Sequence, residues 1–477
     1  MLEMTIDDFT QHRLAAEGAM DATLWDEAAR EYEAALSLIA AGEGAGEDEG
    51  ALLTALGACY WNLSEARTAW RTLRRAIALY RDRGDGVGMA RATTEILRIW
   101  GPPDRHRAMA DEALAALGDA DPYLRALLLL RRSWHDDDDP ELQEVLRLAE
   151  QHGFEDLLTI NTQIESRKAF DTGRLDEANA LSESAHERYA RLRVYDPAAG
   201  VLRGAGFVTM MYGRLDEGAA LATRCLAYAR QVHLRFTEQL ALMDLAGEAF
   251  ARADYARCRA VLAQTPTDSD FRGDLYRMWM TELAGDSDGA LRMMVDPERG
   301  GGAPTALSQT HCANAGVLFH AGKRDAARRE LETWAQVARQ SGSFCEELPA
   351  IFDCLVALGG DELVTEVHDA LANNAAKAAP MAYGTLQGRA IGPARGALAL
   401  RLGLTDEAER AYGEGLAWCE RERVPIDAGL CLAGLAGVAR SRGDENTAAA
   451  HLERAASTFE EHDARLWLER LVIAPRG

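Results

Sequence analysis

Two segments of the sequence hold residue types that could bind a phosphate or a metal ion, but their spacing argues against both sites. Residues 322–325, GKRD, contain the Gly-Lys pair of a phosphate-binding loop. No Gly stands five residues before Gly322, and Arg324 takes the place of the required Ser or Thr. Residues 135–140, HDDDDP, offer carboxylates without the ligand spacing of a calcium loop. The Asp-Pro that ends this segment is instead typical of a helix start.

The histidines and cysteines provide no metal cluster or catalytic signature either. If His311 and His320 lie on one helix, their spacing puts them on opposite faces, so they cannot share a zinc ion. A Ser–His–Asp or Cys–His arrangement formed by folding stays open, but no nucleophile lies in a known signature. The eight cysteines contain no CxxC pair, which indicates reduced, mostly buried thiols. We therefore expect no enzyme activity, no metal and no cofactor.

The charge balance of the chain is strongly acidic. Its 477 residues include 52 Lys and Arg against 76 Asp and Glu, a net charge of −24. This balance argues against nucleic acid or an anionic membrane as a direct partner. No stretch approaches the ~20 apolar residues of a membrane span, and the first residues contain no apolar signal core. We therefore expect a cytoplasmic protein.

Apolar residues recur at helical spacing along nearly the whole chain, and a short motif repeats. Residues 173–177 and 213–217 both read GRLDE, an offset of 40 residues. Each Gly is expected to end one helix in the left-handed conformation, and the acids to favour the first turn of the next helix. The small residue after the acid pair, such as Ala178, lets the two helices approach closely. We predict hairpins that turn near residues 23, 64, 173, 213, 253, 285, 322, 403 and 443.

Two stretches carry a family resemblance. LGACY at 56–60, followed by Ala69, Leu73 and Ala76, resembles the tetratricopeptide (TPR) pattern, with Leu in place of Phe. Residues 383–471, which include LRLGLTDEAERAYGEGLAW, resemble the helical-repeat region of LuxR-type regulators and related signal-transduction ATPases. The resemblance implies an all-α, right-handed α-solenoid of about twelve TPR-like hairpins. We expect two parts, 1–300 and 301–477, which meet at a Gly-rich break, and a capping helix at the end of the second.

The TPR resemblance also indicates where a ligand would bind. In stacked units of this kind, the first helix of each pair lines the concave face of the array. Aromatic, Met and Arg side chains are common at binding hot spots, and an Arg can donate two parallel hydrogen bonds to a carboxylate. The residues of these types that we expect to face the groove are Arg167, Phe170, Arg203, Phe207, Met210, Met243, Phe250, Arg272, Trp279, Phe319 and His320.

The sequence therefore predicts a non-enzymatic scaffold that binds a protein or peptide in its concave groove, in bacterial-type signalling or regulation. The alternative is a regulator that senses a small molecule and has no DNA-binding domain of its own. A tight pocket with convergent polar groups would favour the second, and an open groove the first. The sequence alone names neither the partner nor the oligomeric state.

Overall fold

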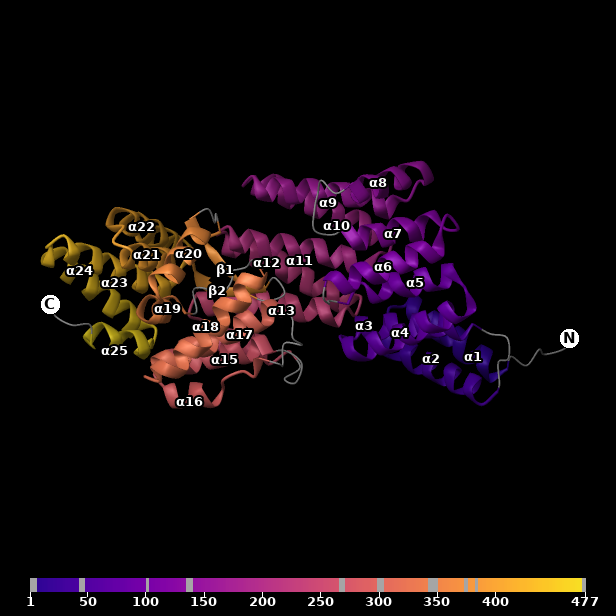
Figure 1. Cartoon of the computed structure of the whole chain (residues 1–477), viewed down its shortest axis with the longest axis horizontal. Helices are drawn as coiled ribbons and strands as arrows, with labels where there is room; N and C mark the ends of the chain where they lie inside the picture. The colour runs from indigo at the N-terminus through magenta and orange to yellow at the C-terminus, as the bar shows by residue number, and fades with distance from the viewer. Residues whose placement is uncertain are drawn as a thin grey trace. The chain divides into compact units, whose positions relative to one another are not determined.

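The structure is a computed structural model, shown in Figure 1. It describes residues 7–42, 48–99, 103–133, 140–265, 271–297, 304–341, 351–372, 376–381 and 385–473. Most of the HDDDDP segment and the break around residue 300 lie outside these residues. Contacts divide the chain into unit 1, residues 1–202 and 225–238, and unit 2, residues 203–224 and 239–477.

The described residues form twenty-five helices, equivalent to twelve pairs and one terminal helix. The helices of unit 1 are α1 (Asp8–Asp21), α2 (Trp25–Ala40), α3 (Glu49–Asn62), α4 (Ala66–Arg83), α5 (Gly86–Ile96), α6 (Pro103–Leu117), α7 (Pro122–Ser133), α8 (Pro140–His152), α9 (Glu155–Asp171) and α10 (Leu175–Arg191). Three helices contribute residues to both units: α11 (Tyr195–Met211), α12 (Leu215–Gln231) and α13 (Arg235–Ala251).

The remaining helices belong to unit 2. They are α14 (Tyr255–Leu262), α15 (Phe271–Leu283), α16 (Ser287–Arg292), α17 (Pro304–His320), α18 (Arg324–Ser341), α19 (Phe352–Leu358), α20 (Asp361–Ala372), α21 (Gly392–Arg401), α22 (Thr405–Glu422), α23 (Pro425–Ser441), α24 (Glu445–Glu461) and α25 (Arg465–Ile473). Successive helices pack against each other as antiparallel hairpins, for example α1 with α2 and α23 with α24. The all-α class and the repeated helical hairpins are confirmed.

All nine predicted turns are present, each between two helices of the chain. The glycines at 173, 213, 285, 322, 403 and 443 have positive φ angles of 73–96°, which only Gly adopts without strain. Other turns place a different residue in this conformation, such as Thr23 and Ser64. The small residue of each second helix is buried, as Ala178 and Ala448 show. Local chemistry therefore specifies the repeat.

One short β-hairpin interrupts the helices. Strand β1 (Ala378–Met381) pairs antiparallel with β2 (Thr385–Ala390). The sequence predicts only helices here, so the hairpin departs from that prediction. At Gly388, with φ +76°, an added Cβ would lie 2.3 Å from the Gly247 carbonyl oxygen on α13. Close packing on a distant helix therefore stabilises this hairpin.

The core of unit 1 includes residues 225–238, which are far away in the sequence from the rest of the unit. The indole Nε1 of Trp25 donates a hydrogen bond to the carbonyl oxygen of Val232, at 3.2 Å. The ring of Phe236 packs on Trp61 with 4.9 Å between centroids. Both tryptophans are buried, so this segment packs directly against the first hairpins of unit 1.

The core of unit 2 combines side chains from before and after residue 300. Tyr276 on α15 and Trp334 on α18 are both fully buried in it, and Trp467 on α25 packs against it. Helix α25 contacts both α24 and α15. Among the described helices, none is both long and apolar enough to cross a membrane.

Candidate functional site

The second half of α11 presents the predicted pair Arg203 and Phe207, which lie one helical turn apart. The guanidinium of Arg203 stacks over the Phe207 ring at 5.1 Å. Its Nε and Nη2 also donate to Oδ2 and Oδ1 of Asp244 on α13, at 3.0 and 3.4 Å. Asp244 is fully buried. The Arg203 donors that were predicted to bind a ligand carboxylate therefore bind Asp244, and the Phe207 ring is partly exposed.

Most of the other predicted groove residues pack inside the protein. Arg167 is exposed and Phe170 is buried in unit 1, whereas the other residues of the set belong to unit 2. The buried members in unit 2 are Met210, Met243, Phe250, Arg272, Trp279 and Phe319. The Trp279 ring lies 6.0 Å from that of Phe250 and 5.8 Å from that of Tyr276. In this structure these side chains fill the core. Their role as ligand contacts stays a prediction.

His320, the last predicted residue, lies between two carboxylates. Its Nδ1 is 2.6 Å from Oε1 of Glu282 on α15, and its Nε2 is 2.7 Å from Oδ2 of Asp353 on α19. Burial alone would lower the pKa of His320, but the two carboxylates together outweigh burial and raise it to about 9. Because both ring nitrogens are occupied and the ring is charged at neutral pH, His320 holds three helices together and is not poised as a general base.

The buried cysteines are similarly unsuited to nucleophilic chemistry. The seven described cysteines are all buried as free thiols, and Cys345 lies outside the described residues. Burial raises the pKa of Cys59, Cys258 and Cys354 to about 12. A nucleophilic thiol requires the opposite shift. These thiols therefore act as small apolar core groups.

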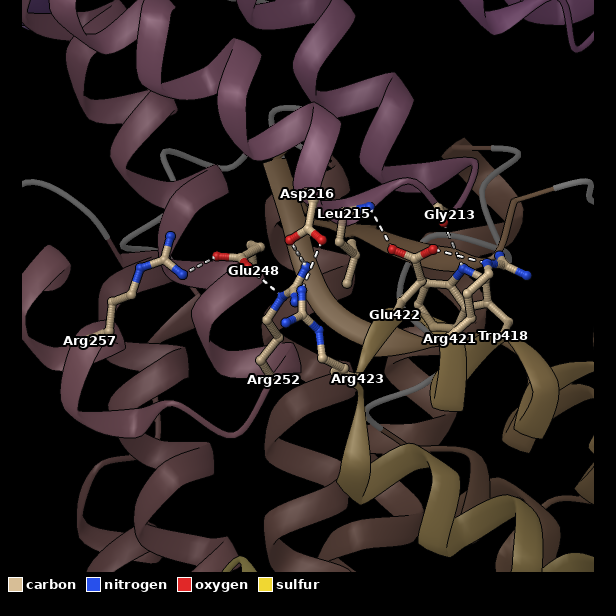
Figure 2. Close-up of polar contacts among 10 residues, drawn as sticks. All are labelled: Gly213, Leu215, Asp216, Glu248, Arg252, Arg257, Trp418, Arg421, Glu422 and Arg423. Carbon is tan, nitrogen blue, oxygen red and sulfur yellow. Dashed lines mark hydrogen bonds and ion pairs between the residues drawn. The ribbon is translucent and has the colours of Figure 1, made fainter.

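A polar network that the sequence did not predict surrounds the turn between α11 and α12 (Figure 2). Asp216 on α12 accepts from Arg252, which follows α13, and from Arg423, which follows α22, at 2.5 and 2.9 Å. Arg252 also pairs with the buried Glu248, whose second oxygen binds Arg257 at 2.7 Å. Asp216 is largely exposed, so its own pairs contribute little. The Glu248–Arg252 pair has the i, i+4 spacing that favours a helical ion pair, whereas no local spacing connects Asp216 or Arg423 to it.

The end of α22 fixes the same turn through backbone contacts (Figure 2). The Trp418 Nε1 donates to the Gly213 carbonyl oxygen at 3.1 Å, and the Leu215 N–H donates to Glu422 Oε2 at 3.0 Å. An added Cβ on Gly213 would lie 2.3 Å from Trp418 Nε1, whereas nothing lies within 4 Å of one on Gly173. Two identical GRLDE turns thus have different surroundings: one is covered by α22 and the other is exposed to solvent.

This difference gives a matched pair of substitutions. Gly173→Ala adds only the strain of a left-handed Ala, and we expect it to lower the free energy of unfolding by about 1 kcal/mol. Gly213→Ala adds the same strain and also displaces the Trp418 indole, so we expect a loss of about 2–4 kcal/mol. Urea titrations followed by circular dichroism measure both. Equal losses would show that α22 does not cover the turn at Gly213.

No protein-family model matches the sequence, and no curated protein matches it. Solved structures align along nearly the whole chain at low identity. One is the APC/C hetero-tetramer Cut9–Hcn1, with 12% identity over 98% of this chain and 97% of that chain and a TM-score of 0.28. Another is the human IFIT1 dimer with m7Gppp-AAAA, with 14% identity over 96% and 91% and a TM-score of 0.29. A third is yeast Tom70, with 14% identity over 98% and 96% and a TM-score of 0.28.

Proposed function

We propose that this protein is a non-enzymatic, cytoplasmic scaffold that binds a protein or peptide partner on its helical repeats, in signalling or regulation. The arrangement of Arg203 and Phe207 on α11 carries the proposal. Asp244 fixes the guanidinium, and the guanidinium in turn supports the partly exposed Phe207 ring. An aromatic ring held in one orientation loses little entropy on binding, which is a property of interface hot spots.

The buried ionisable groups support a binding role over catalysis. Both ring nitrogens of His320 are occupied by Glu282 and Asp353, and the described cysteines are buried as free thiols in the core. The resemblance of the C-terminal repeats to those of LuxR-type regulators favours a regulatory setting. Direct binding of nucleic acid is not part of the proposal, because the chain carries a net charge of −24.

The test uses a peptide that the full-length protein selects from a random displayed library. We expect Phe207→Ala to weaken the binding of that peptide by about tenfold, as for a hot-spot aromatic. Leu404→Ala, which removes another exposed apolar side chain of unit 2, is the matched control and should leave the affinity unchanged. Fluorescence polarisation measures the binding, and circular dichroism confirms folding. If a folded Phe207→Ala variant binds like the wild type, α11 is not the contact surface.

The alternative of a small-molecule sensor has its own observation in unit 1. A pocket with convergent polar groups lies among α4, α5 and α6, which is the feature that favours that alternative.

A further inference from the structure

The pocket in unit 1 has a volume of about 180 Å³ and is lined by side chains from three helices. Its lining residues are Arg74, Ile77, Ala78 and Arg81 of α4, Met89 and Thr93 of α5, and Arg105, Met109 and Glu112 of α6. Apart from the adjacent Ile77 and Ala78, consecutive lining residues within each helix are three or four positions apart, so they lie on one side of the helix. Since a cavity of about 150 Å³ admits benzene, this one has room for a group of about six to eight heavy atoms.

Three arginines and one glutamate are the charged residues that line the pocket. Arg81 donates through Nε and Nη2 to the two oxygens of Glu112, at 2.6 and 2.9 Å, and this pair is neutral overall. Arg105 lies 5.1 Å over the ring of Trp70. Neither it nor Arg74 has an ion-pair partner within the part of the chain that the structure describes. Two uncompensated guanidinium groups therefore face the pocket in an otherwise acidic protein.

Thr93 supplies a second, independent indication of a ligand. The residue is 1% exposed, and its Oγ1 has no hydrogen-bond partner among the described residues. Helical threonines elsewhere in this protein, such as Thr54 and Thr159, donate to the carbonyl four residues earlier at 2.8 Å. A buried hydroxyl without a partner costs about 1–3 kcal/mol. Because Thr93 is one of the residues that line the pocket, a ligand in the pocket lies next to this unpartnered hydroxyl.

The remaining wall is apolar and adaptable. Ile77, Met89 and Met109 form it, and Met side chains adjust to the shape of a bound group. The carboxylate of Glu112 in the same pocket disfavours a ligand with two negative charges, such as a phosphate. The preferred ligand thus combines one planar negative group with a short hydrocarbon body.

We propose that this pocket binds a carboxylate carried on a short apolar body. The carboxylate lies between Arg74 and Arg105, which form charge-assisted hydrogen bonds with it. The Thr93 hydroxyl donates to a ligand oxygen, and the hydrocarbon packs on Ile77 and the two methionines. The carboxylate belongs either to a free small acid or to the C-terminus of a peptide. This site lies in unit 1 and shares no residue with α11, so it goes beyond the proposed scaffold function.

Pentanoate is the probe, and its uncharged analogue pentanamide is the ligand control. We expect pentanoate to bind the full-length protein saturably and pentanamide at least about tenfold more weakly, because charge-assisted hydrogen bonds are lost. Titrations by ligand-observed NMR measure both. Equal binding of the two probes, or a Kd for pentanoate weaker than about 10 mM, would overturn the proposal.

Two variants and two matched controls locate the binding. Arg74→Gln and Arg105→Gln should each weaken the binding of pentanoate by about tenfold or more. The controls Arg71→Gln and Arg107→Gln remove exposed arginines of the same helices that do not line the pocket, and they should bind like the wild type. Losses of equal size in the controls would show only a general charge effect and overturn the assignment.

Thr93→Val separates binding from folding. It keeps the side-chain shape and removes a hydroxyl without a partner, so the Tm of the free protein should stay equal or rise. Pentanoate should bind this variant about three- to tenfold more weakly; unchanged binding would contradict the role of Thr93. A Gly-Gly-Leu peptide with a free C-terminus that binds more tightly than pentanoate would identify a peptide terminus as the source. Binding no tighter than pentanoate would identify a free acid, and both results require the same pocket.

Discussion

His320→Ala should lower the free energy of unfolding of unit 2 by about 3–5 kcal/mol at pH 7, because it leaves buried carboxylates without their cation. The His320 side chain is 4% exposed and that of Glu282 is 8% exposed. Arg470 lies 3.5 Å from Asp353 and remains as a partner for it. Glu282 has no other partner among the described residues, so the loss falls mainly on this carboxylate.

Two further variants test this explanation. His311→Ala removes a histidine from the same helix that pairs with one carboxylate, Glu330, at 2.6 Å in a more exposed position. We expect it to cost about 1 kcal/mol or less. Adding Glu282→Gln to His320→Ala removes the unpaired charge, so part of the lost stability should return. Urea titrations followed by circular dichroism measure all three, and equal effects of the two histidine variants would refute the buried triad.

The same triad should make stability depend on pH in a defined direction. The pKa of His320 is raised from its ordinary value of 6.5 to about 9 in the folded protein. Its contribution is therefore fully present below about pH 6.5 and is lost as the pH rises through about 9. At about 1.36 kcal/mol for each pKa unit, the difference between 6.5 and 9 is on the order of 3 kcal/mol. The wild type should lose this stability between those pH values, and His320→Ala should not.

Trp279→Ala should produce the second large effect, a loss of about 3–5 kcal/mol in the free energy of unfolding. The Trp279 ring is 5% exposed and packs with the rings of Phe250 and Tyr276 in the core of unit 2. Truncation leaves a cavity that such close packing cannot fill. Sequence analysis placed both Trp279 and Phe207 in a ligand groove, so the two substitutions compare a core position with a surface position.

Phe207→Ala is the control for Trp279→Ala. Its ring is partly exposed and contacts the Arg203 guanidinium, so the loss should be about 1 kcal/mol. Because repeat proteins can unfold in stages, the urea midpoint of each variant should be measured by both circular dichroism and tryptophan fluorescence. If Trp279→Ala proves as mild as Phe207→Ala, the indole lies in an open groove, as the sequence suggested.

The sequence by itself determined the repeating unit. Helical spacing, a left-handed Gly and a following acid act over a few residues, so the turns near 173, 213, 403 and 443 could be predicted from their neighbours in the chain. The small residues after the acids, such as Ala178 and Ala408, were predicted for the same reason and are fully buried. The interactions that specify a helical hairpin are local.

Only the tertiary structure decided what each repeat contacts. GRLDE is the same at 173–177 and 213–217, yet Trp418, 205 residues away, covers only Gly213. From the sequence, Arg203 was predicted to bind a ligand carboxylate. In the structure its guanidinium binds Asp244, 41 residues later. An aromatic or Arg at helical spacing can face either a groove or a neighbouring helix, and the choice depends on packing between distant segments. That packing is set by the whole chain, so no local pattern could predict it.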